Sequence, residues 1–166
     1  MEISKKNNSY KITNILLIIY LFILTFVILF KIGFPELGRR SINLIPYGGS
    51  VIVNGKINIL ELIYNIIAFI PFGIYISILK TNWNFIKKVV PIFGVSLVFE
   101  ITQFVFGVGA SDITDLINNT IGGIIGILIY VMLTKIFKSD LKINKVINIF
   151  ASLGTICSVL LLVVLI

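Results

Sequence analysis

Five apolar stretches, each of about twenty residues, follow one another along this chain of 166 residues and constrain its fold more than any other feature. An α-helix rises about 1.5 Å per residue, so a stretch of this length crosses the hydrocarbon core of a bilayer. Charged residues make up 13% of the chain, against about a quarter in a soluble domain. We therefore predict an all-α, multi-pass helical membrane protein with a single domain over residues 1–166. The spans are expected near residues 12–30, 59–79, 89–108, 116–137 and 146–166, with a long loop at 31–58.

The distribution of Lys and Arg sets the expected orientation, because cytoplasmic loops carry an excess of both. Of the 14 such residues, ten lie in the N-terminal segment and in the connections near residues 80–88 and 135–145. The loop at 31–58 carries the other four. We therefore expect the N-terminus in the cytoplasm, and the C-terminus and the loop outside. Because topology accounts for the basic residues, no nucleic-acid partner is expected.

Two residue types that serve many active sites are scarce in this chain. It contains no His and a single Cys, Cys157, which lies within an apolar stretch. A zinc site of the His type, a Ser-His-Asp triad and an intramolecular disulfide are therefore excluded.

Polar side chains within the apolar stretches indicate a functional region, because a charged group at the centre of a membrane helix costs about 2.5–3.5 kcal/mol. In the expected orientation these residues fall in the outer halves of three spans, and the inner halves hold few. Helical spacing places Glu100 and Gln103 on one face, and Asp115 and Asn119 on another. We therefore expect an outward-facing polar pocket that binds a ligand. Its candidate residues are Asn65, Glu100, Gln103, Asp112, Asp115 and Asn119, with Arg39 and Arg40 from the loop.

Small residues and one proline predict how the helices pack beneath this pocket. Gly122 and Gly126 are four residues apart, a spacing that lets a second membrane helix approach closely. Pro71 and Gly73 lie in the second span, where Pro71 predicts a kink. These four residues are expected to serve helix packing.

Some of the polar residues also have simpler interpretations. Asp112 and Asp115 favour the start of a helix, with Ser111 as its cap. Glu100 could form a structural ion pair with an arginine. Arg39 and Arg40 could be interfacial anchors, and because they are adjacent we expect at most one of them to enter the pocket.

Short motifs in a fixed order give the sequence a family resemblance. They are Asn43-Leu44-Ile45-Pro46-Tyr47, Asn65-x3-Phe69-x-Pro71-Phe72-Gly73, Glu100-x2-Gln103, and Ala110-Ser111-Asp112-Ile113-Thr114-Asp115 with Asn119-x2-Gly122-x3-Gly126. With these motifs the chain resembles the VanZ-like family of bacterial membrane proteins, named for a teicoplanin-resistance protein. The resemblance covers residues 43–126 and implies an integral protein of the bacterial cytoplasmic membrane. It also adds Asn43 to the pocket candidates. In the family's founding member it implies reduced susceptibility to teicoplanin.

The chain departs from the family pattern at one position of interest. Many members carry an Arg shortly before the first Asp of the last motif, where this chain has Gly109-Ala110-Ser111. Any anion-binding role of that Arg would therefore fall to Arg39, to Arg40 or to no residue.

Three functions remain open from the sequence, and we favour the non-enzymatic one. In the first, the pocket binds an amphipathic ligand such as a membrane lipid, a lipid-linked cell-wall precursor or a lipoglycopeptide. In the second, Glu100, Asp112 and Asp115 hold Mg²⁺ or Mn²⁺ for an enzyme that acts on a lipid-linked phosphate. In the third, the protein transports or scrambles lipid, with a homodimer supplying further walls. No cofactor is expected outside the enzymatic alternative.

Overall fold

A computed structural model describes residues 2–30, 39–47, 52–53, 56–57, 59–137 and 139–165. The side chains of 2–6, of Phe30, of Arg39, of 52–57, of Ser158 and of 161–165 are outside the description. Five helices follow one another: α1 (Glu2–Phe30), α2 (Ile59–Leu79), α3 (Phe85–Phe106), α4 (Ile113–Phe137) and α5 (Asp140–Leu165). The described strands are β1 (Arg39–Asn43), β2 (Ile52–Val53), β3 (Lys56–Ile57) and β4 (Val108–Asp112).

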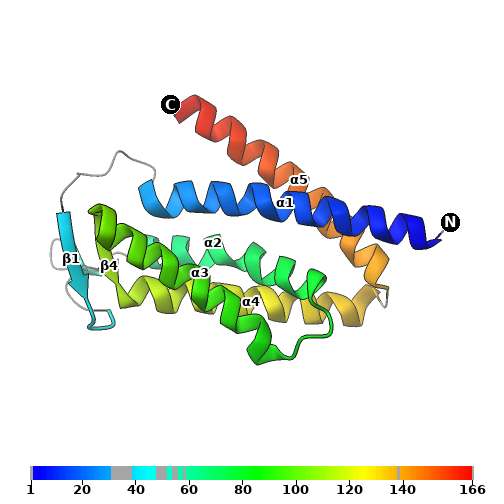
Figure 1. The fold of residues 1–166 in the computed structure, drawn as a ribbon, viewed down its shortest axis with the longest axis horizontal. Helices are drawn as coiled ribbons and strands as arrows, with labels where there is room; N and C mark the ends of the chain where they lie inside the picture. The colour runs from blue at the N-terminus through cyan, green and yellow to red at the C-terminus, as the bar shows by residue number, and fades with distance from the viewer. Residues whose placement is uncertain are drawn as a thin grey trace.

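Helices α1 to α4 run lengthwise beside one another between two ends of the molecule (Figure 1). One end carries the N-terminus and the α2–α3 and α4–α5 connections, and we call it the N-terminal end. The other carries β1 and β4, and we call it the strand end. Within the described residues, the parts long and apolar enough to cross a membrane are Asn7–Leu29, Ile59–Leu79, Phe85–Phe106 and Ile113–Phe137. The protein is thus a multi-pass helical membrane protein.

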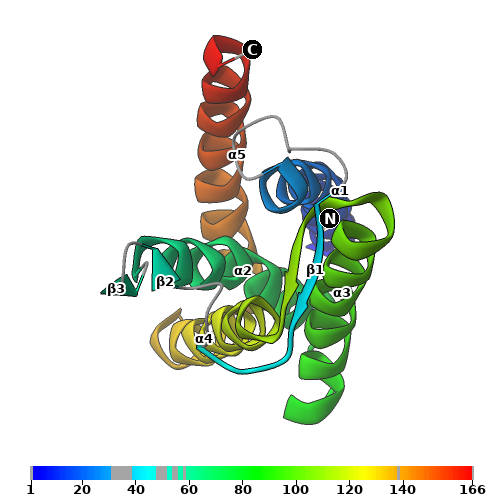
Figure 2. The same ribbon diagram turned by 90° about the vertical axis from the view of Figure 1, so that its left-hand side faces the viewer.

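Helix α5 forms where the sequence predicts a fifth span. It contacts α1 and then leans away from the other four helices toward its C-terminal end (Figures 1 and 2). Its first turns carry Asp140, Lys142 and Lys145, and its apolar part follows from Val146.

A parallel strand pair closes the strand end, and the sequence analysis did not predict it. Strand β1 of the long loop pairs with β4 between α3 and α4, in a register that sets Arg39 beside Val108 and Asn43 beside Asp112. Figure 2 shows the two strands crossing this end of the molecule. The pairing brings together two of the sequence motifs, at Asn43 and at Asp112, that lie far apart in the chain.

The two ends of α3 are set by its flanking residues. Asn84 precedes the helix with extended backbone, and its side-chain oxygen accepts the N–H of Lys87 at 2.9 Å. The helix therefore begins at Phe85, four residues before the expected span. Gly107 ends it with a φ of 64°, the left-handed conformation that glycine adopts without steric cost.

Helices α2 and α4 approach each other most closely at glycines. A Cβ added at Gly122 would lie 2.1 Å from the carbonyl oxygen of Ile66, and one at Gly126 would lie 2.1 Å from that of Ile70. From the other side, a Cβ at Gly73 would lie 1.9 Å from the carbonyl oxygen of Gly123. The backbones of α2 and α4 are therefore in direct contact, which fixes their separation.

An apolar core fills the space between α1, α2, α3 and α4. It includes Leu24 of α1, Phe69 and Phe72 of α2, and Phe99 of α3. The rings of Phe69 and Phe99 meet edge to face, with centroids 6.2 Å apart, a preferred arrangement of aromatic pairs.

A cluster of buried polar side chains lies between α1 and α5, toward the N-terminal end. It corrects the expectation that the inner halves of the spans hold few polar groups. Thr13 Oγ1 of α1 lies 2.8 Å from Asn144 Oδ1 and 3.0 Å from Asn148 Oδ1 of α5. Asn148 Nδ2 also donates to the carbonyl of Ser9 at 3.1 Å. These residues are buried between α1 and α5. The sequence analysis missed the cluster because single Thr and Asn residues carry no charge. Their insertion into an apolar span costs less free energy than that of a charged residue.

Candidate functional site

A cavity of about 570 Å³ lies near the strand end, and we call it the polar cavity. Its walls come from α1, α2 and α4. It is lined by Val27, Ile28, Leu60, Glu61, Tyr64, Asn65, Ile67, Ala68, Asp115 and Asn119. The volume falls in the range of cavities that hold small ligands. Three of the candidate residues from the sequence therefore line one cavity: Asn65, Asp115 and Asn119.

Asn65 and Asp115 join the two helices that form the floor of the polar cavity. Both are buried, and Asn65 Nδ2 donates to Asp115 Oδ1 at 2.6 Å. Asn65 stands in the second turn of α2 and Asp115 in the first turn of α4. Both helices start at the strand end, so side chains in their first two turns lie near each other. A carboxylate near a helix N-terminus is also favoured by the helix dipole.

Asn119 lies one turn deeper on the same face of α4 and is fully buried. Its Nδ2 donates to Ser96 Oγ of α3 at 2.9 Å. Its Oδ1 has no hydrogen-bond partner among the residues that the structure describes. A buried carbonyl oxygen without a partner is costly, so this atom offers an acceptor to a molecule in the cavity.

Glu100 and Asp112 form a network beside the cavity without lining it. Glu100 Oε2 accepts the backbone N–H of Asp112 at 2.7 Å, and Asp112 Oδ1 accepts the N–H of Thr114 at 2.8 Å. Asp112 thus caps α4, a role that the sequence analysis assigned to Ser111. Asn43 Nδ2 lies 3.3 Å from both carboxylate oxygens of Asp112. The network anchors the start of α4 to α3 and to β1.

The side chains of Gln103 and Arg40 donate hydrogen bonds to backbone carbonyls near the ends of helices. The buried Gln103 donates from Nε2 to the carbonyl of Ile28 at 3.1 Å, in the last turn of α1, where carbonyls lack partners within the helix. Arg40 is exposed, and its Nη2 donates to the carbonyl of Val105 at 3.2 Å, near the end of α3. Arg40 is therefore not among the residues that line the polar cavity. The side chain of Arg39 lies outside the described residues.

The three acidic candidates do not form a metal site in the described part of the chain. Each carboxylate is engaged by a different partner: the Asp112 N–H, the Thr114 N–H or the Asn65 amide. No group of three His, Cys, Asp or Glu side chains among the described residues is placed to hold a metal ion. In the described structure each of these carboxylates thus serves as a hydrogen-bond acceptor for a protein group.

Two polar residues of the polar cavity, Glu61 and Tyr64, are not among the candidates from the sequence, yet both line it. The signal was available, because Glu61 and Asn65 are four residues apart and share a helix face. The position of Glu61 close to the start of the helix is, however, also typical of an ordinary interfacial residue.

Two comparisons identify known proteins whose sequences are similar to this chain. A family model described as VanZ/LLP1 matches residues 16–137, which hold α2 to α4 and about half of α1. Protein VanZ of Enterococcus faecium is 39% identical over 153 residues, covering 89% of each chain. No solved structure matches the chain.

Proposed function

The chain belongs to the VanZ/LLP1 family, and from this premise we propose that it binds an amphipathic, lipid-linked component of the cell envelope in the polar cavity. Binding there lowers the susceptibility of the bacterial cell to teicoplanin-type lipoglycopeptides. The observation that carries the proposal is the convergence of Asn65, Asp115 and Asn119 on one cavity of about 570 Å³. The strand end faces the outside in the orientation expected from the basic residues, and cell-wall precursors and lipoglycopeptides are found there.

The lining groups define what the cavity accepts. The carboxylates of Glu61 and Asp115 and the Oδ1 of Asn119 are hydrogen-bond acceptors. A ligand therefore presents donors to them, either hydroxyl and amide groups or an ammonium group. Hydrogen bonds to ionised groups contribute about 1.5–3 kcal/mol each, so the carboxylates dominate the recognition.

The test is teicoplanin susceptibility in a susceptible Gram-positive host, with vancomycin as the comparator. The wild type is expected to raise tolerance to teicoplanin. Asp115→Asn is expected to lose most of that protection, because ligand affinity falls about tenfold or more. The substitution preserves size, and the new amide oxygen still accepts from Asn65, so the helix contact is retained.

Two further variants control the test at matched membrane abundance. Asp140→Asn makes the same chemical change at the exposed start of α5, at the N-terminal end, and is expected to protect like the wild type. Glu100→Gln keeps an acceptor for the Asp112 N–H and lies outside the cavity lining, so it is expected to retain most of the protection. If Asp115→Asn protects as well as the wild type, the proposal is wrong.

A further inference from the structure

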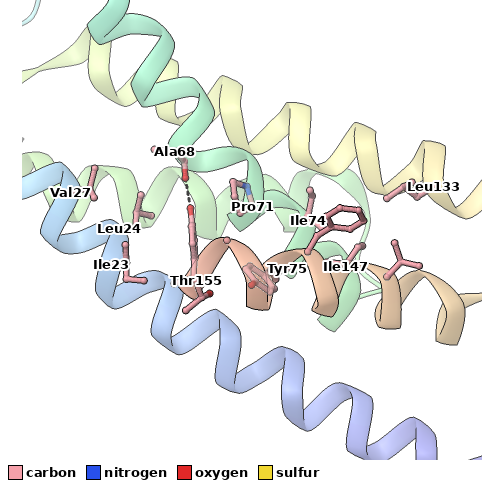
Figure 3. A pocket seen from close by; sticks show the side chains of 15 residues that line it. Ile23, Leu24, Val27, Ala68, Pro71, Ile74, Tyr75, Leu133, Ile147 and Thr155 are labelled. Carbon is pink, nitrogen blue, oxygen red and sulfur yellow. Dashed lines mark hydrogen bonds between the residues drawn. The ribbon is translucent and has the colours of Figure 1, made fainter. Parts of the chain in front are cut away.

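Two further cavities lie beside α5, and they differ in chemistry. A second cavity, of about 540 Å³, lies between α1, α2 and α5 and is mainly apolar; Figure 3 shows side chains that face it, among them Leu24, Pro71 and Ile147. A third, of about 620 Å³, lies between α1 and α5 toward the N-terminal end, and we call it the α1–α5 groove. Its lining is mainly polar and comprises Asn8, Ser9, Ile12, Lys145, Asn148, Ile149, Ser152 and Leu153.

The α1–α5 groove lies where both helices change from polar to apolar. In α1 the charged residues end at Lys11, and the apolar stretch begins at Ile12. In α5 they end at Lys145, and the apolar part begins at Val146. Such a change marks the passage of a helix from water into hydrocarbon, so the groove lies at the level of the lipid head groups. In the orientation expected from the basic residues, these head groups belong to the cytoplasmic leaflet.

The polar part of the groove offers a positive charge and hydrogen-bond donors. Lys145 is exposed and is the one charged residue in the described lining. Ser9 is only 6% exposed, and its Oγ has no hydrogen-bond partner among the described residues. A buried hydroxyl without a partner is costly, and rotation about χ1 turns it toward a ligand. An ammonium group beside a hydroxyl donor suits a phosphate group.

The deeper part of the groove is apolar. Ile12 follows Ser9 by one turn of α1, and Ile149 and Leu153 follow Lys145 by one and two turns of α5. All three apolar side chains are exposed. A ligand that fills the whole groove therefore carries an acyl chain next to its phosphate, as a phospholipid does.

Two of the polar lining residues hold the groove in shape. Asn148 Nδ2 donates to the carbonyl of Ser9 at 3.1 Å, and Ser152 Oγ donates to the carbonyl of Asn148 at 2.7 Å. Asn148 thus ties α5 to the turn of α1 that carries the Ser9 hydroxyl. Ser9 and Lys145 are thereby kept on the two walls of one groove.

We propose that the α1–α5 groove binds an anionic phospholipid of the cytoplasmic leaflet, with its phosphate at Lys145 and Ser9 and an acyl chain along Ile12, Ile149 and Leu153. The site lies at the opposite end of the molecule from the polar cavity and is independent of the proposed function. The lipid bridges α1 and α5 beside Asn148, so it also helps to hold α5 on α1.

The experiment uses phosphatidylglycerol as the probe. The full chain is reconstituted in phosphatidylcholine nanodiscs that contain a small fraction of phosphatidylglycerol with a photoreactive group close to its glycerol. Crosslinks are expected in α1 and α5 around the groove, and unlabelled phosphatidylglycerol competes for them. Diacylglycerol with the same acyl chains lacks the phosphate and does not compete. Inorganic phosphate in the buffer lacks the acyl chains and does not compete either.

Variants with a matched control assign the phosphate contacts. Lys145→Gln is expected to lower crosslinking about fivefold, because one basic group near an anionic surface is lost. Lys142→Gln removes the same charge one turn earlier on α5, outside the groove lining, and is expected to leave crosslinking unchanged. Ser9→Ala removes the hydroxyl but keeps the backbone carbonyl that Asn148 contacts, and is expected to lower crosslinking about threefold.

Four results would overturn the inference. Crosslinking that is unaffected by Lys145→Gln would remove the phosphate contact. An equal loss in Lys142→Gln would show a general attraction between basic residues and the anionic surface. Competition by diacylglycerol as strong as that by phosphatidylglycerol would show that acyl chains alone are bound, and displacement by inorganic phosphate would assign the groove to a soluble anion. Protection against teicoplanin, which Asp115→Asn tests, does not depend on any of these results.

Discussion

Asp112 shows how one buried residue, through its side chain and its backbone N–H, holds three elements at the strand end. Its carboxylate caps α4 through the Thr114 N–H and contacts the amide of Asn43 in β1, while its own N–H donates to Glu100 in α3. Because it is buried, each of these groups would otherwise lose its hydrogen bonds to water. The start of α4, and with it Asp115, is thereby fixed relative to the cavity.

Two substitutions at Asp112 separate the capping role from the charge. Asp112→Asn is expected to leave the free energy of unfolding close to that of the wild type, because Asn caps helices as well as Asp does. Asp112→Ala is expected to lower it by about 1–2 kcal/mol, since the Thr114 N–H loses its acceptor. Denaturation of the detergent-solubilised protein measures both. Equal stability of the two variants would show that the cap is unimportant.

The sequence predicts the positions of some site residues but not of others. Asn65, Asp115 and Asn119 could be placed together because helical spacing and a common depth are readable from the chain. The position of Arg40 could not, because it depends on where β1 lies against α3. Nor could the cap at Asp112, which depends on β4 ending there.

At the scale of elements, the contact between α2 and α4 sets the floor of the polar cavity. Gly126→Ala is expected to lower the free energy of unfolding by about 1–3 kcal/mol, because its Cβ would meet the backbone of α2 and force the helices apart. Gly94→Ala is the control, since its Cβ meets no atom within 4 Å. It is expected to be neutral or stabilising by up to about 1 kcal/mol. Titration with a denaturing detergent compares the two, and equal effects would argue against the close packing.

The five helices were predicted from hydropathy because a membrane span has a length and an apolar content that single residues hardly change. The strands could not be predicted in the same way. Segments 39–43 and 108–112 are short, show no alternation of apolar and polar residues, and pair across a long separation in sequence. Their pairing follows from the helices that hold them at one end.

At the scale of the whole molecule, the orientation in the membrane decides which side the polar cavity serves. We expect the strand end outside. In a Cys157→Ser background, an impermeant maleimide should label Ile45→Cys in intact cells, because Ile45 is exposed at the strand end. Asn82→Cys, in the exposed α2–α3 connection, should be labelled only after permeabilisation. The opposite pattern would turn the cavity toward the cytoplasm and contradict a role at the outer surface.

Helix α5 has a consequence for the biogenesis of the protein. The walls of the polar cavity come from α1, α2 and α4, so they are complete as soon as α4 has left the ribosome and entered the bilayer. The second cavity, between α1, α2 and α5, forms only when α5 is in place, and α5 contacts α1 through Thr13, Asn144 and Asn148. Because α5 is synthesised last, the polar cavity is complete before this second cavity forms.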